Sequence, residues 1–241
     1  MSVQTMIKFS LAPVLVWQGR QVRKRTPVLP EARGPRKGIT GGNDRGLFRL
    51  LVIGDSAAAG VGVDHQENSL MGQILECIPS GIRVSWALWA KSGITTEQMV
   101  GLLEETPAVR FDVAVTSLGV NDVKAGVEPD AWLGLQQRLV SLLEKKFGIR
   151  HIVLSAVPPM NEFPALPWPL GWYLGRVARK MNQKLDQWTM GKNSLSFIPF
   201  DLPIDPVHMA EDGFHPGPVL HGIWARQVAD RILSMESSPG D

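Results

Sequence analysis

Five short apolar runs, separated by segments with helical spacing, constrain the fold of this chain more than any other feature. Each run is short and rich in aliphatic residues, as buried strands are; the runs cover residues 47–54, 83–89, 112–118, 151–157 and 195–200. Apolar residues recur at three- and four-residue steps in the segments that follow them, namely 69–78, 95–105, 130–147, 170–190 and 218–235. This alternation predicts an α/β fold of three layers, with a five-stranded parallel sheet between helices, flavodoxin-like in plan.

The regular pattern begins only at residue 47. Residues 1–49 carry a net charge of +8, whereas residues 50–241 carry −6, so the basic character is confined to the beginning of the chain. Proline and glycine are frequent over residues 26–46, which indicates an irregular connector. We therefore expect a basic, Pro/Gly-rich N-terminal extension (1–46), one main domain (47–236) and a short C-terminal tail (237–241).

The first 25 residues bear on where the protein works. Their longest apolar run, residues 9–17, contains Pro13 and is much shorter than the about 18 apolar residues of a spanning helix. Basic residues follow this run rather than precede it, unlike in a secretory signal, and the single cysteine, Cys77, allows no internal disulfide. We expect a cytoplasmic protein. Residues 1–25 either contact a membrane surface peripherally, through apolar burial and basic attraction, or pack on the body of the protein.

Polar residues follow the predicted strands at the edge where open α/β sheets bind their ligands. Ser56 ends a Gly-Asp-Ser sequence directly after the first strand, Gly93 follows the second, and Asn121 follows the third. Asp212 and His215 come three residues apart just before the last predicted helix. A serine hydroxyl becomes a good nucleophile when a base removes its proton, and a histidine held by an aspartate can be that base.

In block order and spacing, residues 47–235 resemble the SGNH hydrolases, the superfamily that includes the GDSL lipases and esterases. The resemblance implies that Ser56 is the nucleophile, His215 the base and Asp212 the residue that orients the base. It also implies an oxyanion hole formed by the N–H groups of Ser56 and Gly93 and the side-chain amide of Asn121, with no metal or organic cofactor.

Two of the blocks depart from the family pattern. Ala57 stands after the serine where the family name has leucine, and Ala90 and Lys91 stand where an asparagine often precedes the glycine of the second block. The first departure does not touch the chemistry, whereas the second lies in the loop that carries Gly93.

The chain contains a second Asp-x-x-His sequence, Asp205 to His208, which ends seven residues before His215. Gly213 and Pro216 fit the family block around the later pair. We therefore expect His215 to be the base and His208 to be an ordinary loop histidine.

The segment after the fourth predicted strand, residues 158–174, is too apolar for a solvated loop. Its members Phe163, Trp168, Leu170 and Trp172 are candidates for the wall of an acyl-binding pocket. The alternative is that they cover the core.

These residues together predict a serine esterase or lipase that hydrolyses carboxylic esters, short-to-medium acyl or lipid-like, through an acyl-Ser56 intermediate. A carbohydrate O-acetylesterase is the alternative enzyme, because tryptophans also stack on sugar rings. A non-catalytic ligand-binding protein on the same fold is the alternative of another class. We expect a small-molecule or lipid ester as the partner, no metal, and no nucleic acid, because the basic residues lack aromatic interleaving on a sheet or helix.

Overall fold

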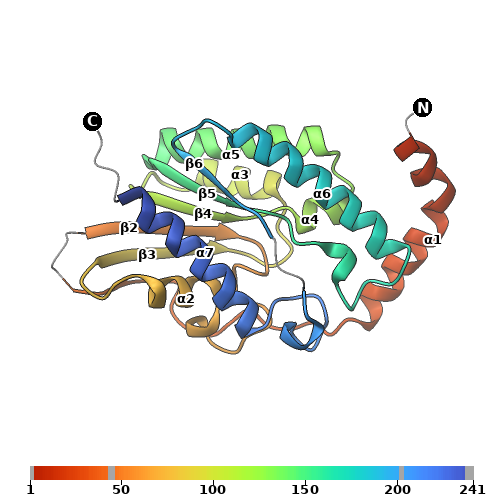
Figure 1. Ribbon diagram of the computed structural model, residues 1–241, viewed down its shortest axis with the longest axis horizontal. Coiled ribbons are helices and arrows are strands. Elements are labelled where there is room, and N and C mark those ends of the chain that lie inside the picture. The colour runs from red at the N-terminus through yellow and green to blue at the C-terminus, as the bar shows by residue number, and fades with distance from the viewer. Residues whose placement is uncertain (1–2, 43–46, 201–203, 237–241) are drawn as a thin grey trace.

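The computed structural model describes residues 3–42, 47–200 and 204–236. The tail expected at 237–241 and the last part of the expected connector, 43–46, lie outside the described residues. The described chain forms a mostly parallel sheet of six strands in the order β1-β3-β2-β4-β5-β6, with helices on both faces (Figure 1).

The five predicted strands are present and run parallel to one another. Their order, with the first strand between the second and the third, is the flavodoxin-like order. The predicted α/β fold class is therefore confirmed. The strands are β2 (Leu47–Gly54), β3 (Arg83–Ala90), β4 (Val113–Ser117), β5 (His151–Ser155) and β6 (Leu195–Ile198).

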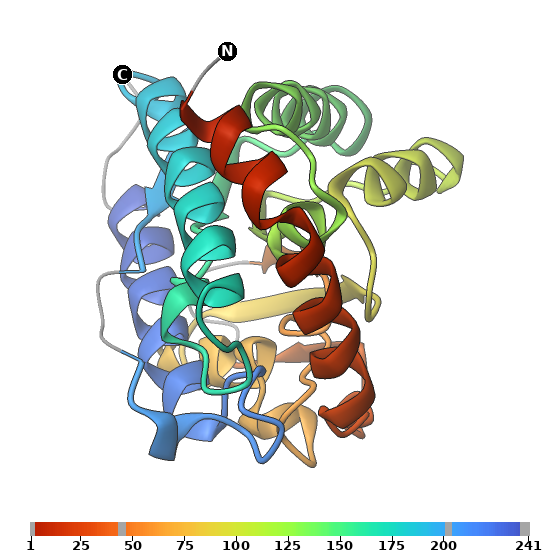
Figure 2. The same ribbon diagram turned by 90° about the vertical axis from the view of Figure 1, so that its right-hand side faces the viewer.

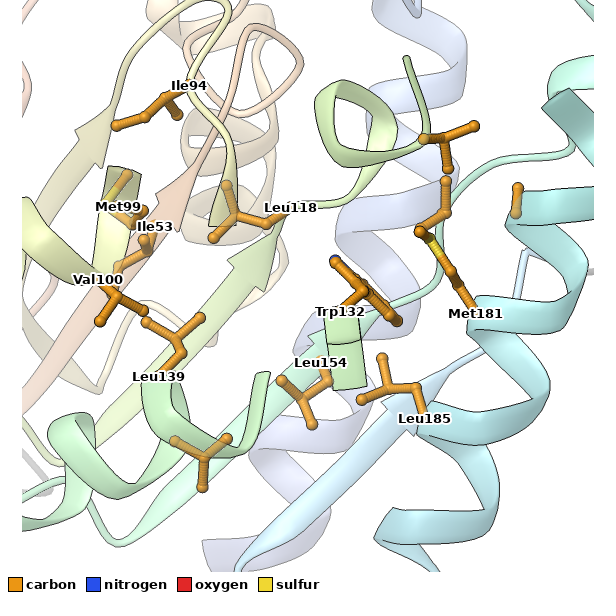
Figure 3. Close-up of a cluster of buried hydrophobic side chains, with 14 of the residues drawn as sticks. Ile53, Ile94, Met99, Val100, Leu118, Trp132, Leu139, Leu154, Met181 and Leu185 are labelled. Carbon is orange, nitrogen blue, oxygen red and sulfur yellow. The ribbon is translucent and has the colours of Figure 1, made fainter. Parts of the chain in front are cut away.

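The two faces of the sheet carry separate hydrophobic cores, because successive side chains of a strand point to opposite sides. Leu51 and Ile53 of β2 belong to one core, and Leu50 and Val52 belong to the other. Trp132 lies at the centre of the first core, near Leu154, Met181 and Leu185 (Figure 3). Helices α3 (Thr96–Glu105), α5 (Pro129–Phe147) and α6 (Leu170–Thr189) cover this core, and α2 (Leu70–Cys77) and α7 (Pro218–Glu236) cover the other. The remaining short elements are α4 (Val120–Ala125), η1 (Gln66–Asn68), η2 (Met160–Glu162) and η3 (Pro206–His208).

The expected irregular connector contains a sixth strand, β1 (Lys37–Thr40), which pairs antiparallel with β3 at the edge of the sheet. Its four residues are mostly exposed, so no apolar pattern marked it in the sequence. Gly38 allows the two strands to approach, since a Cβ there would come within 3.0 Å of the Trp86 ring. The N-terminal segment thus contributes to the sheet of the main domain.

The first helix, α1 (Val3–Arg25), crosses the end of the molecule where the parallel strands terminate (Figure 2). Leu15 is only 8% exposed and joins the first core. The Gln18 side chain donates a hydrogen bond to Trp168 O (2.8 Å) and accepts one from Leu170 N (3.1 Å), which fixes α1 to the start of α6. None of the described helices is long and apolar enough to cross a membrane.

Candidate active site

The structure brings the three predicted catalytic side chains together. Ser56 lies in the turn after β2, and its Oγ is 2.9 Å from Nε2 of His215, a residue 159 positions later. The other ring nitrogen of His215, Nδ1, is 2.5 Å from Oδ2 of Asp212. This is the arrangement in which a histidine can take the serine proton while the aspartate orients the ring.

The loop that carries His215 is held by Asp212 itself. Its Oδ1 accepts hydrogen bonds from the backbone N–H groups of Phe214 (2.9 Å) and His215 (3.0 Å). Gly213 makes this tight turn possible with φ +62°, a left-handed conformation that favours glycine. Burial alone would raise the pKa of Asp212, but the hydrogen bonds from the His215 ring and the two backbone groups hold it below its usual value. Asp212 is therefore an ionised partner for the histidine at neutral pH.

The second Asp-x-x-His sequence has a different role. The Asp205 carboxylate accepts a hydrogen bond from Val207 N (3.0 Å) and caps η3. The His208 backbone oxygen accepts one from Gly217 N (2.9 Å), so this segment supports the loop around His215.

The turn that carries Ser56 is packed tightly against β4. A Cβ at Gly54 would lie 2.7 Å from Ser117 O, so only glycine fits where the two strands approach. Asp55 is buried, and its carboxylate accepts a hydrogen bond from Ala57 N (3.1 Å). Burial raises the pKa of Asp55 to about 6, against the lowering effects of the Ala57 bond and of nearby positive charges.

The other two candidate oxyanion residues, Gly93 and Asn121, follow the two strands that flank β2. Gly93, between β3 and α3, has φ +80°, a backbone conformation that favours glycine. Asn121, in the first turn of α4, is buried and donates through Nδ2 to Ile94 O (3.0 Å) and to Asp55 Oδ2 (3.3 Å). These contacts join the loop of Gly93, the helix of Asn121 and the turn of Ser56 at one edge of the sheet.

Asp122 supports this arrangement without facing the nucleophile. Its carboxylate accepts hydrogen bonds from the backbone N–H and the hydroxyl of Thr96, the latter at 2.8 Å. The Thr96 hydroxyl in turn accepts a hydrogen bond from Trp132 Nε1 (3.2 Å). Asp122 therefore fixes α4 to the start of α3.

Glu31, in the N-terminal segment, also belongs to the surroundings of the site and had no signal in the sequence. Its carboxylate accepts hydrogen bonds from the N–H and the hydroxyl of Ser92, both 2.8 Å long, next to Gly93. Arg36 bridges Glu31 at 2.8 Å and donates to Ala90 O at 2.7 Å. Partial burial would raise the pKa of Glu31, but the Ser92 and Arg36 contacts lower it. The connector thus fixes the loop that carries Gly93.

Lys124 is a second residue of the site that the sequence analysis missed. Its Nζ donates to Asn121 Oδ1 (3.2 Å) and lies 5.2 Å from the centre of the Phe214 ring. The spacing contained a signal, since residues three apart in a helix share one face. Partial burial of the ammonium group lowers the pKa of Lys124; Asp55 opposes this effect and Arg23 adds to it.

A largely apolar pocket opens beside Ser56 and His215, between the ends of β4 and β5 and the start of α7. Of the four predicted wall residues, Phe163 lines this pocket, whereas Leu170 is buried in the first core. Trp168 and Trp172 are 78% and 38% exposed and lie outside the lining, because the start of α6 turns Leu170 and Leu174 inward instead. The apolar lining consists mainly of Leu118, Val157, Phe163, Phe200, Ile204, Met209, Phe214, Leu220 and Trp224. Among the residues described, no three His, Cys, Asp or Glu side chains are grouped so that they could hold a metal ion.

Comparisons with known proteins bear on the fold and the family of the chain. A search of curated proteins finds no match. Among solved structures, the carbohydrate acetylesterase Est24 from Sinorhizobium meliloti matches with a TM-score of 0.59 and 16% identity, over 78% of this chain and 99% of that one. The aryl esterase of M. smegmatis matches with a TM-score of 0.61 and 15% identity, again over 78% and 99% of the two chains. A member of the lipolytic G-D-S-L family from Veillonella parvula gives a TM-score of 0.58 and 16% identity, over 78% and 97%.

At these identities the structural matches establish the fold alone. The sequence model of the GDSL-like lipase/acylhydrolase family, however, matches residues 52–223, which is most of the chain and includes every predicted catalytic residue. The chain therefore belongs to the GDSL-like lipase/acylhydrolase family of the SGNH hydrolases and is an ester-hydrolysing enzyme.

Proposed function

We propose that the protein is a serine esterase that acts through an acyl-Ser56 intermediate. The observation that carries this proposal is the chain of contacts from Ser56 Oγ to His215 Nε2 and from His215 Nδ1 to Asp212 Oδ2, beside an apolar pocket. His215 takes the proton of Ser56 as the hydroxyl attacks the ester carbonyl, and then gives that proton to the leaving alcohol. Water, activated by the same histidine, releases the acid from Ser56.

The negative oxygen that forms during attack needs donors that are already in place. We assign these to the N–H groups of Ser56 and Gly93 and to the Asn121 amide. The contacts of Asn121 with Ile94 O and Asp55 Oδ2 support the assignment, because they hold its amide between the loops of Gly93 and Ser56.

The pocket favours an apolar acyl group, short-to-medium in length or lipid-like. Its side chains from Phe163, Phe200 and Leu220 offer burial to methylene groups and few polar partners. Deacetylation of a carbohydrate is the second candidate, because solved structures of similar fold include carbohydrate acetylesterases.

We also propose that the protein is cytoplasmic and reaches ester substrates at a membrane surface through residues 1–25. Trp17 on α1 is 61% exposed and Trp168, in the segment bonded to Gln18, is 78% exposed. Arg20 and Lys24 lie one and two turns after Trp17 on α1, and tryptophan with basic residues suits an anionic lipid interface. Sedimentation with vesicles of anionic and of zwitterionic lipid tests this contact. Stronger binding to the anionic vesicles, weakened by salt, supports it, and no binding to either excludes it.

Activity is tested with nitrophenyl esters of increasing acyl length beside acetylated sugars, together with labelling by a fluorophosphonate probe. We expect labelling and ester turnover in the wild type, and neither in Ser56→Ala, which should fold normally. A preference for acetylated sugars would select the second candidate. An unlabelled wild-type protein without turnover would mean a ligand-binding protein on this fold.

A further inference from the structure

A lysine side chain, that of Lys124, contacts the side-chain oxygen of Asn121, one of the candidate oxyanion residues. Lys124 stands one turn after Asn121 in α4, and although the residue is exposed as a whole, its ammonium group returns to the Asn121 side-chain oxygen at 3.2 Å. The same ammonium group lies 5.2 Å from the Phe214 ring centre, and the Phe214 ring lies 5.3 Å from that of His215. The ammonium group of Lys124 is therefore held between Asn121 and the Phe214 ring, which in turn lies next to His215.

The partners of Asn121 give its amide one orientation. Lys124 is purely a donor, so it requires the amide oxygen, whereas Ile94 O and Asp55 Oδ2 are acceptors and require the amide nitrogen. Turning the amide over would bring Oδ1 against two oxygens and Nδ2 against an ammonium group. Lys124 thus supplies a hydrogen bond to Oδ1.

The charge of Lys124 also changes what the amide can donate. A cation at the carbonyl end draws electron density from the amide and makes the N–H groups at the other end better donors. One of these N–H groups points to Asp55 Oδ2 over 3.3 Å, the longer of its two bonds. Asp55 directly precedes Ser56, so this N–H lies on the side of the amide that faces the turn of the nucleophile.

We propose that Lys124 is a positioning residue for ester hydrolysis: its ammonium group holds and polarises the Asn121 amide, so that Nδ2 can donate to the oxygen that becomes negative in the transition state. This inference rests on the proposed function, since it assumes that Asn121 is an oxyanion donor. Among the residues that the structure describes, the charged groups that face Lys124 are Asp55, from the turn after β2, and Arg23, from α1, with His215 beyond the Phe214 ring. Asp55 attracts the cation, whereas Arg23 repels it.

The first test compares Lys124→Met with Lys124→Arg and with Lys145→Met, a change at an exposed lysine on α5. Losing an oxyanion donor typically costs about 10²–10³ in rate, and weakening one should cost less, about tenfold in kcat, with KM nearly unchanged. Lys124→Arg should recover much of the activity because it keeps the charge, and Lys145→Met should match the wild type. A Lys124→Met enzyme with wild-type kcat, or one that changes in KM alone, overturns the proposal.

The second test separates action through Asn121 from a general effect on folding. If Lys124 acts through the amide, Lys124→Met should cost little further in an Asn121→Ala background, although it costs about tenfold in the wild type. Equal losses in both backgrounds would show that Lys124 acts independently of Asn121 and would reject the proposal.

The pH profile gives a third readout. The helpful form of Lys124 is the cation, so kcat should fall as the pH rises through the pKa of Lys124, which burial lowers from the ordinary lysine value. This alkaline limb should move to higher pH in Lys124→Arg and be absent in Lys124→Met. An identical limb in Lys124→Met excludes the role. These outcomes all require an active wild type that the fluorophosphonate probe labels, so failure of the proposed function would be recognised first and separately.

Discussion

His208 and His215 each end an Asp-x-x-His sequence, but only the ring of His215 contacts Ser56. We expect His215→Ala to lower kcat by several orders of magnitude, nearly as much as loss of the serine, because triad members act as a unit. His208→Ala should lower it only slightly, through the η3 loop. Steady-state kinetics on one nitrophenyl ester would check both variants, and the reverse pattern would reassign the base.

Asn121 gives a different kinetic signature. An oxyanion donor acts mainly in the transition state, so Asn121→Ala should lower kcat by about 10²–10³ and change KM little. Asn121→Asp is a useful companion, because it keeps the size of the side chain but puts a carboxylate where a donor is needed, and it should be at least as damaging. A rise in KM alone in Asn121→Ala would make Asn121 a substrate-binding residue.

At the same scale, the sequence predicted the residues that carry motifs and missed those that only support them. Ser56, Asp212 and His215 could be found because each stands at a fixed place relative to a strand or helix. Glu31 could not, because it meets Ser92 across 61 positions with no spacing to mark the pair. Trp168 and Trp172 were candidates for the pocket wall but lie outside its lining, because composition does not reveal which way a helix start turns its side chains.

At the scale of elements, β2, β4 and β5 were predictable because a strand buried on both faces must be apolar throughout. β3 and β6 are partly exposed, but they too are short runs rich in apolar residues. The edge strand β1 was not predictable, because its residues are largely exposed and its conformation depends on pairing with β3. The packing of α1 was equally hidden, since apolar residues lie on several sides of the helix: Leu15 is buried, whereas Val16 is 53% exposed. Both elements lie outside residues 52–223, the part that matches the family.

Substitutions at Leu15 and Val16, two adjacent residues of α1, can measure how strongly this helix packs on the first core. Leu15→Ala should lower the free energy of unfolding by about 2 kcal/mol, the low end for a buried leucine, because α1 lies at an edge of the core. Val16→Ala should change it by less than about 0.5 kcal/mol. Urea unfolding with constant m-values would provide both numbers. Equal and small effects would indicate that α1 does not pack on the body in solution.

At the scale of the whole molecule, buried ionisable groups set how stability depends on pH. His221 on α7 is fully buried next to Trp224, and burial, with a smaller effect of His215, lowers its pKa to about 3. The unfolded chain binds a proton at this histidine near pH 6.5, whereas the folded chain does not. The contribution of His221 to the free energy of unfolding is therefore complete above pH 6.5 and is lost as the pH falls toward 3.

Asp55 acts in the opposite direction, because its raised pKa makes the folded chain bind a proton more readily than the unfolded one. Its contribution is complete below pH 3.8 and is lost as the pH rises through about 6. Replacing His221 removes its contribution to the pH dependence of the free energy of unfolding and leaves the opposite contribution of Asp55. We expect His221→Phe to resist acid better than the wild type, by up to about 1.4 kcal/mol for each pH unit below 6.5.

Unfolding free energies measured between pH 4 and 8 would reveal this difference, with His65→Gln, a change at an exposed histidine, as the control that keeps the wild-type slope. Parallel curves for His221→Phe and the wild type would mean that water reaches His221 in solution.

The course of α7 has a practical consequence for attaching the enzyme to a surface. The helix begins at Pro218, three residues after His215, and runs to the opposite end of the molecule, where the parallel strands begin (Figure 1). A linker joined after α7 would leave the mouth of the pocket turned toward the solution. A linker joined before α1 would start from the helix that crosses the catalytic edge (Figure 2). Immobilisation through the carboxyl-terminal end should therefore preserve turnover of bulky esters better than immobilisation through the other end.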